Sequence, residues 1–303
     1  MNTPAHMDEH TLDAAVVAAA EAAAAAVAAE EVEDDQVFTI EMMDVGGQGL
    51  RVGRTTGNGL HPPLLMFNGI GGNIELLAPL AHALAEREVI TFDIPGVGRS
   101  QMPRLPYRLR DIANLATRLL DMLGHRQVDV LGVSWGGAAA QQFVRTAPRR
   151  CRRLILCATS PGAVMVPGRP GVLWKMATPK RYVSRRYAQT VVGDIYGGDF
   201  RNNPDVAAPH FKHIKWQSSK GYYLQLAAAA GWTSIHWLMH IRQPTLIMVG
   251  EDDPLVPAVN GRMMNQLIPR SELKTFDCGH LFLLTRIEAS RIAIQEFLDR
   301  SDA

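Results

Sequence analysis

The stretch GVSWG at Gly132–Gly136 has the pattern Gly-x-Ser-x-Gly and follows directly on the apolar run Val128–Leu131. A helix is predicted directly after it, from Gly136 to about Thr146. A sharp, strained turn between a strand and a helix lifts a serine hydroxyl clear of the sheet, and such a turn needs small residues beside the serine. The N-terminus of the following helix favours negative charge that develops beside it. We therefore predict that Ser134 is a catalytic nucleophile.

Short apolar runs alternate with helical patterns on both sides of this motif. The predicted helices are about Asn73–Arg87, Leu109–Leu123, Gly136–Thr146, Val259–Leu267 and Ile287–Arg300. The predicted strands are Val37–Met42, Leu50–Thr55, Leu64–Phe67, Val89–Phe92, Val128–Leu131, Leu154–Cys157, Thr245–Val249 and Leu273–Phe276. Buried strands that alternate with helices form a mostly parallel sheet with helices on both faces, which is the α/β class.

The alternation breaks between the strands predicted at Leu154–Cys157 and Thr245–Val249. The insert, from Ser160 to about His240, is rich in Trp, Tyr and Met and shows no regular period. Open α/β sheets bind ligands at the carboxyl ends of their strands, so an insert between two strands at that edge covers the site. We therefore predict an irregular, aromatic lid.

A serine nucleophile needs a base, and the base needs an acid that holds its tautomer. His280 stands on a loop between the last predicted strand and the last predicted helix, a placement that the other histidines lack. Three acids, Glu251, Asp252 and Asp253, follow an earlier strand and compete for the third role. The resulting chain order of serine, acid and histidine is known for enzymes with this turn. Adjacent buried carboxylates would repel each other, so only one of the acids should face inward.

The tetrahedral intermediate of acyl transfer carries a negative oxygen, which needs N–H donors. One donor should be the backbone N–H of Trp135, the residue after the nucleophile. The second should come from the loop Asn68–Asn73, where Ile70 is the best candidate, because the glycines of this loop let the backbone turn an N–H inward. The histidines and cysteines lack the spacing of metal ligands, so we expect neither a metal nor another cofactor.

The composition argues against several classes of protein. The 303 residues contain 31 Lys and Arg against 30 Asp and Glu, which leaves no strong positive field for binding nucleic acid. The three cysteines form no disulfide pattern, which favours a reducing compartment. No apolar run is long enough for a membrane span. We therefore expect a cytoplasmic protein without a transmembrane segment.

Residues 1–36 form an alanine-rich, low-complexity extension. Acidic residues precede its apolar stretch, which is the reverse of a secretory signal, and it ends in the acidic run Glu30–Asp35. A solvated extension fits this composition, and a weak adhesion helix is the alternative. We therefore divide the chain into this extension and one domain over residues 37–303, with the lid inserted at about 160–240.

Six stretches of the sequence are motifs of a known family: Phe67–Gly71, Asp93–Gly98, Gly132–Gly137, Gly162–Gly168, Gly231–Leu238 and Gly279–Leu283. They resemble those of the intracellular medium-chain-length poly(3-hydroxyalkanoate) depolymerases, a family of the α/β-hydrolase superfamily. The two motifs inside the lid are the specific ones, because the whole superfamily shares the turn at the serine. The resemblance covers roughly Val37–Leu298.

The resemblance implies an α/β-hydrolase fold and hydrolysis of the ester bonds of a storage polyester with medium-length side chains. The products would be 3-hydroxy fatty acids or short oligomers, and the partner would be a polyester granule surface or a polymer chain. The family's triad carries over onto Ser134, Asp253 and His280. An aromatic lid suits a greasy polymer. The candidate substrate contacts in the lid are Trp174, Trp232, His236 and Trp237.

Three alternatives compete with this interpretation. A soluble carboxylesterase or lipase-like hydrolase of small acyl esters would use the same residues. Polyester synthases share the fold but carry cysteine at the nucleophile position, so Ser134 argues against acyl transfer. A non-catalytic granule-associated protein would have a broken triad, whereas all three positions hold competent residues.

Overall fold

The computed structural model describes residues 37–203 and 218–301 of the chain. From Phe38 onward, the described residues belong to one compact unit. The alanine-rich extension predicted at residues 1–36 lies outside the described residues.

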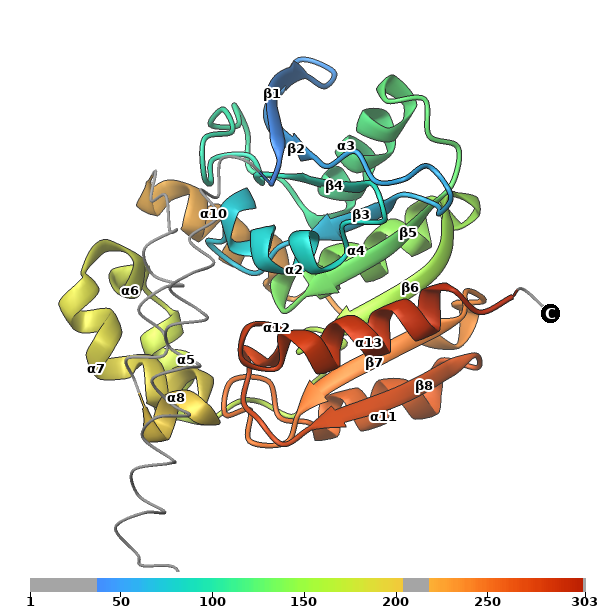
Figure 1. Cartoon of the computed structure of the whole chain (residues 1–303). Coiled ribbons are helices and arrows are strands. Elements are labelled where there is room, and N and C mark those ends of the chain that lie inside the picture. Colours follow the sequence, from blue (N-terminus) through green and yellow to red (C-terminus); the bar gives the residue numbers. More distant parts are fainter. Residues whose placement is uncertain (1–36, 204–217, 302–303) are drawn as a thin grey trace, which may run out of the picture. The chain divides into compact units, whose positions relative to one another are not determined.

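A single eight-stranded sheet forms the centre of this unit, with the strand order β1-β2-β4-β3-β5-β6-β7-β8 (Figure 1). Its strands are β1 Thr39–Asp44, β2 Gly49–Arg54, β3 Leu64–Phe67, β4 Val89–Phe92, β5 Val128–Val133, β6 Cys151–Cys157, β7 Thr245–Gly250 and β8 Ser271–Phe276. The β1–β2 and β2–β4 pairs are antiparallel, and all other neighbours in the sheet are parallel. The mostly parallel sheet predicted from the sequence is therefore confirmed.

Strands β3 and β4 have the predicted bounds because each is a short run of fully buried apolar residues. Strand β6 begins three residues before the predicted start, at Cys151. The two arginines that follow Cys151 conceal this start in the sequence. The Arg152 guanidinium donates to buried Asp129 of β5 at 2.9 Å and 2.6 Å, so the charge is neutralised within the sheet.

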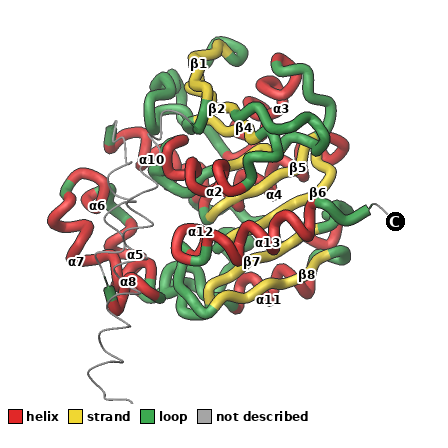
Figure 2. Tube along the Cα trace, in the orientation of Figure 1, coloured by secondary structure: helices red, strands yellow, loops and turns green. Residues whose placement is uncertain are grey.

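Helices cover both faces of the sheet (Figures 1 and 2). On one face α2 (Ala78–Ala83) packs against α13 (Ile287–Leu298). On the other face α3 (Leu109–Met122) packs against α4 (Trp135–Thr146), and α11 (Val259–Leu267) lies against β7 and β8.

The helix predicted over Asn73–Arg87 is divided into two short pieces. A 3₁₀ helix, η2, spans Ile74–Leu77, and α2 follows it and ends at Ala83. Pro79 stands in the first turn of α2, where a residue without a backbone N–H is tolerated. The prediction of one continuous helix over Asn73–Arg87 was therefore wrong.

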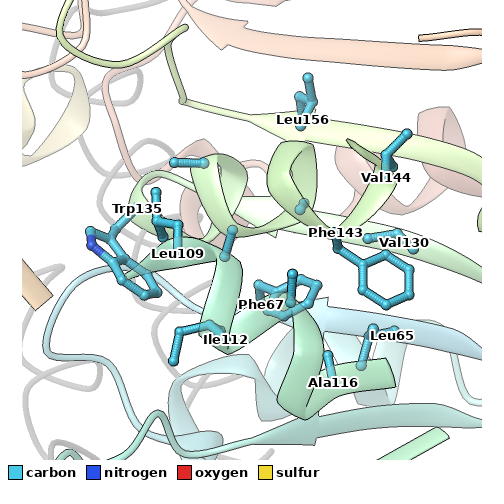
Figure 3. Close-up of a cluster of buried hydrophobic side chains, with 14 of the residues drawn as sticks. Leu65, Phe67, Leu109, Ile112, Ala116, Val130, Trp135, Phe143, Val144 and Leu156 are labelled. Carbon is cyan, nitrogen blue, oxygen red and sulfur yellow. The ribbon is translucent and has the colours of Figure 1, made fainter. Parts of the chain in front are cut away.

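The main hydrophobic core lies between the sheet and the pair α3–α4 (Figure 3). Phe67 of β3 is central to it, with its ring centroid 5.8 Å from that of Phe92 in an edge-to-face arrangement and 6.1 Å from that of Phe143. Leu109, Ile112 and other apolar residues of α3 complete the cluster. This core anchors β3 and β5, whose carboxyl ends lead into the loop Asn68–Asn73 and into Ser134.

The described part of the insert between β6 and β7 is largely helical, so the prediction of an irregular lid was wrong for these residues. Ser184 and Ser218 cap two of its helices, because their side chains accept hydrogen bonds from Tyr187 N and Gly221 N. A second apolar cluster, around Ile195, joins the insert to Leu255 of the loop after β7. Its helices are α5 Pro170–Met176, α6 Lys180–Val183, α7 Arg185–Tyr196, α8 Asp199–Asn202 and α10 Ser219–Ala229, followed by the 3₁₀ helix η5 Leu238–His240.

Among the described residues, no helix combines the length and the apolar character that a membrane span requires.

Candidate active site

Ser134 occupies the turn between β5 and α4 in a strained backbone conformation. Its φ of 54° and ψ of −117° are unusual for a residue with a Cβ atom. Two hydrogen bonds to the end of β6 and the residues after it fix this turn. Ser134 N donates to Cys157 O at 2.8 Å, and Ser134 O accepts from Thr159 Oγ1 at 2.7 Å. Strain of this kind persists where the surrounding structure fixes it, and it is typical of functional sites.

The two glycines of the motif are required by close backbone approach. A Cβ atom at Gly132 would lie 2.3 Å from the carbonyl oxygen of Gly136. A Cβ atom at Gly136 would lie 2.1 Å from the carbonyl oxygen of Phe67, where α4 crosses the end of β3. Any side chain at either position would therefore push the start of α4 away from the sheet and displace Ser134.

His280 and Asp253 form a buried acid–base pair. The His280 Nδ1 lies 2.6 Å from Asp253 Oδ2, and both side chains are almost wholly inaccessible to water. The second carboxylate oxygen, Oδ1, accepts from the backbone N–H groups of Leu255 at 2.9 Å and Val256 at 2.8 Å. Because Asp253 accepts the proton on Nδ1, the lone pair of His280 is left on Nε2, which is the state that a general base requires.

The two acids beside Asp253 face other partners. Asp252 accepts from Gly198 N at 2.8 Å and from the Arg201 guanidinium at 2.9 Å. Glu251 is exposed and accepts from Arg262 at 2.7 Å. Of the three candidates, the structure brings Asp253 to the histidine.

The two predicted oxyanion donors lie on the loop after β3 and at the first residue of α4. Gly69 of this loop adjoins the nucleophile, since a Cβ atom there would lie 3.7 Å from Ser134 Cβ. Within the described residues, the backbone N–H groups of Ile70 and Trp135 have no hydrogen-bond acceptor. Buried N–H groups are nearly always paired, so two unpaired donors beside a serine are suited to a developing oxyanion.

A buried ionic network fixes the chain that follows this loop. Arg51 of β2 donates to Glu75 at 2.7 Å and to Asp93 at 3.3 Å. Asp93 also accepts from the backbone N–H of Ile74 and of Arg99, each at 2.8 Å. Burial raises the pKa of the Asp93 carboxyl, and the Arg99 N–H and the Arg51 charge oppose that rise. In the sequence, Asp93 stands out only as part of a family motif, which gives no sign of this role.

The four candidate substrate contacts in the lid lie in different environments. Trp174 of α5 is 81% exposed, and His236 is also exposed. Trp237 is only 7% exposed and packs in the main core, edge to face with Trp232 at 6.2 Å between ring centroids. Trp232 donates from Nε1 to Gln142 Oε1 of α4 at 2.9 Å. In the described part of the chain, none of the four has a hydrogen bond or ring contact with the three triad candidates.

The lid touches the histidine through Tyr196, a residue that no sequence motif marked. Tyr196, at the end of α7, stacks on the His280 ring with 6.1 Å between centroids and 19° between planes. Its carbonyl oxygen accepts from His280 N at 2.7 Å. A Cβ atom at the nearby Gly198 would lie 2.2 Å from Gly279 N, so the lid and the histidine loop meet in tight contact. The one signal in the sequence that could have indicated this contact is the pair of glycines that follows Tyr196 at the end of α7.

The strand order, the strained serine turn and the buried Asp–His pair define a protein of the α/β-hydrolase class. The family model described as the alpha/beta hydrolase fold matches residues 62–287. The chain is 48% identical to the poly(3-hydroxyalkanoate) depolymerase of Ectopseudomonas oleovorans over 88% of its own length and 94% of that relative. It therefore belongs to the α/β-hydrolase family and, within it, to the poly(3-hydroxyalkanoate) depolymerases, as the sequence motifs predicted.

More distant relatives share the fold. The chain is 23% identical to 3-oxoadipate enol-lactonase 2 of Acinetobacter baylyi, over 81% of this chain and 92% of that one. The crystal structure of the enol-lactonase from Burkholderia xenovorans LB400 superposes with a TM-score of 0.75 at 22% identity, covering 86% of this chain and 100% of the other.

Proposed function

We propose that the chain hydrolyses the ester bonds of a medium-chain-length poly(3-hydroxyalkanoate) through an acyl-enzyme formed on Ser134. The observation that carries this proposal is the buried His280–Asp253 pair, at 2.6 Å, in a chain 48% identical to a poly(3-hydroxyalkanoate) depolymerase. A buried ion pair contributes little to stability, whereas an aspartate that holds a histidine is what a serine nucleophile needs. The pair therefore favours an enzyme over a non-catalytic granule-associated protein.

In this mechanism His280 Nε2 takes the proton of the Ser134 hydroxyl while Oγ attacks the ester carbonyl carbon. The N–H groups of Ile70 and Trp135 stabilise the oxygen that becomes negative. The C–O bond then breaks, His280 returns the proton to the departing 3-hydroxyl group, and an acyl-enzyme remains. Water, deprotonated by His280, repeats the attack, which releases the carboxylic acid and restores the serine.

The outer surface of the lid supports a polymeric substrate. The exposed apolar side chains of its described part include three on or at the end of α5 and α6: Leu173 at 40%, Trp174 at 81% and Val183 at 61% exposure. We refer to these three as the outer lid residues. Exposed Trp and aliphatic side chains suit adsorption to a surface of alkyl chains. We propose that they rest on the surface of polyester granules, so that the protein acts in the cytoplasm at these granules.

A substrate panel tests this function. The purified full-length protein is incubated with an emulsified medium-chain polyester, an emulsified short-chain polyester and a soluble p-nitrophenyl ester, and released 3-hydroxy acids and nitrophenol are quantified. We expect release of 3-hydroxy acids or their short oligomers from the medium-chain polymer. Hydrolysis of the soluble ester alone would instead support a small-ester carboxylesterase, and no hydrolysis at all would support a non-catalytic protein.

A further inference from the structure

Arg181 of α6 is a buried cation surrounded by tyrosines. Only 2% of it is exposed, and within the described residues it pairs with no carboxylate. Its guanidinium donates to the hydroxyl groups of Tyr222 at 2.9 Å, Tyr182 at 3.2 Å and Tyr196 at 3.2 Å. It also lies over the Tyr182 ring, 4.3 Å from the centroid. Charge-assisted hydrogen bonds and ring faces together compensate the desolvated charge. We call these four residues the tyrosine cage.

Tyr182 connects this cage to the oxyanion loop. Its hydroxyl donates to the carbonyl oxygen of Ile70 at 2.6 Å. Burial raises the pKa of Tyr182, so the hydroxyl stays protonated and remains a donor. Arg181 donates to the oxygen of the same hydroxyl group. It therefore orients and polarises the O–H bond that Tyr182 donates to the carbonyl oxygen of Ile70.

Gln225 of α10 holds the other end of the same peptide bond. The N–H of Gly71 donates to Gln225 Oε1 at 2.7 Å, and Gln225 is fully buried. The carbonyl of Ile70 and the N–H of Gly71 belong to one planar peptide unit. The lid therefore fixes both polar groups of the peptide that directly follows the Ile70 N–H.

The same lid residue also contacts Trp135, which carries the second oxyanion donor. The backbone carbonyl oxygen of Gln225 accepts from the indole Nε1 of Trp135 at 2.8 Å. Ile70 and Trp135 follow the neighbouring strands β3 and β5. Gln225 therefore connects the two residues that carry the donors, through its side chain on one side and its backbone on the other.

We propose that Tyr182 and Gln225 are positioning residues of the oxyanion hole, and that Arg181 orients Tyr182 for this role. The hole is complete only while α6 and α10 of the lid are seated on the loop after β3. The lid thus takes part in the chemical step, even for an ester too small to touch its outer surface. This inference rests on the proposed function, because it assigns the negative oxygen to the donors Ile70 and Trp135.

Two matched substitutions test the proposal. Tyr182→Phe removes the hydroxyl that binds Ile70. Tyr223→Phe removes the hydroxyl of a 46% exposed tyrosine of α10, which lies outside the tyrosine cage, and serves as the control. The readouts are kcat and KM on a soluble p-nitrophenyl ester, and the inhibition constant of an alkyl boronic acid. The boronate adduct carries a negative oxygen where the intermediate does.

Tyr182→Phe should lower kcat by about 10- to 100-fold with little change in KM. The inhibition constant of the boronic acid should rise by a similar factor. Tyr223→Phe should change each value by less than about threefold, by the same reasoning. Equal losses in the two variants, or an unchanged kcat in Tyr182→Phe, would overturn the proposal. A wild type that hydrolyses no ester would instead overturn the proposed function.

A second pair guards against a variant that fails to fold. Gln225→Leu removes the acceptor for the Gly71 N–H, whereas Gln225→Glu keeps an oxygen there. Leucine should reproduce the fall in kcat and in boronic acid affinity, and glutamate should restore at least part of both. If the two variants behave alike in both measurements, Gln225 does not position the donor.

Discussion

The inner and outer layers of the lid differ in burial and in what they contact. The inner residues Tyr182, Tyr196 and Gln225 are hydrogen-bonded to the oxyanion loop, the histidine backbone and Trp135. The outer residues, such as Trp174, are exposed and have no such contacts within the described part of the chain. One insert thus combines an inner layer beside the proposed catalytic residues, here called the catalytic edge of the sheet, and an exposed outer layer that we propose adsorbs to a polymer. Changes in the catalytic edge and the inner layer should affect every substrate, whereas changes in the outer layer should affect only the polymer.

The largest effect is expected at the catalytic edge, where two neighbouring acids have different partners. Asp253→Asn keeps the shape of the side chain but removes the charge that stabilises the imidazolium, and it should lower kcat/KM by about 10⁴-fold on polymer and small ester alike. Asp252→Asn, which alters only a contact with Gly198 and Arg201, should cost less than about tenfold. Steady-state rates of both variants on one soluble ester decide the matter. A crippled Asp252→Asn beside an active Asp253→Asn would reverse the assignment.

Two tryptophans of the insert should differ in their effect on stability. Trp237 fills the main core, so Trp237→Ala should lower the free energy of unfolding by about 3–5 kcal/mol. Trp174→Ala removes an exposed ring and should change it by less than about 0.5 kcal/mol. Urea denaturation followed by circular dichroism measures both. Similar midpoints would show that the buried and exposed environments are not as described.

A glycine beside Ser134 and a glycine of the outer lid should also differ in their effect on stability, by a smaller amount. Gly136→Ala places a Cβ atom 2.1 Å from Phe67 O, so it should destabilise the fold by about 1–3 kcal/mol and displace Ser134. At Gly171 of the outer lid helix α5, a Cβ atom would meet nothing within 4 Å, so Gly171→Ala should be neutral or slightly stabilising. Thermal melting of the two variants provides the measurement. A melting temperature unchanged by Gly136→Ala would contradict the close approach of α4 to β3.

The smallest effect is expected at the outer lid. Trp174→Ala should reduce hydrolysis of polymer granules by about three- to tenfold, because it removes apolar area from the adsorbing surface, and should leave kcat/KM on a soluble ester unchanged. Ile292→Ala removes a 42% exposed apolar side chain from α13 and serves as the control that should change neither rate. Parallel losses on both substrates in Trp174→Ala would place this residue in the chemistry rather than in adsorption.

The sequence predicted the sheet well for a physical reason. Buried parallel strands are short apolar runs, so the bounds of β3 and β4 could be read directly. The turn at Ser134 was equally visible, because its glycines are imposed by backbone contact between neighbouring elements. Each of these features changes the residue types within one short stretch of the sequence, so the pattern of that stretch shows it.

The lid could not be predicted in the same way. Its helices bury polar side chains, such as Arg181 of α6 and Tyr222 and Gln225 of α10, which an apolar pattern does not mark. Trp174 and Trp237 are the same residue type in the same insert, yet one is exposed and the other buried. The bonds from Tyr182 to Ile70 and from Gly71 to Gln225 join residues 112 and 154 positions apart, and no local pattern records such contacts.

We propose above all that Ser134 hydrolyses the polymer. The direct measurement is the release of 3-hydroxy acids, quantified by mass spectrometry, from purified medium-chain polyester granules incubated with the wild type or with Ser134→Ala. We expect steady release by the wild type and a loss of at least about 10⁴-fold in the variant, since only the oxyanion donors and substrate binding remain. Comparable release by Ser134→Ala, or none by a wild type that hydrolyses soluble esters, would contradict this claim.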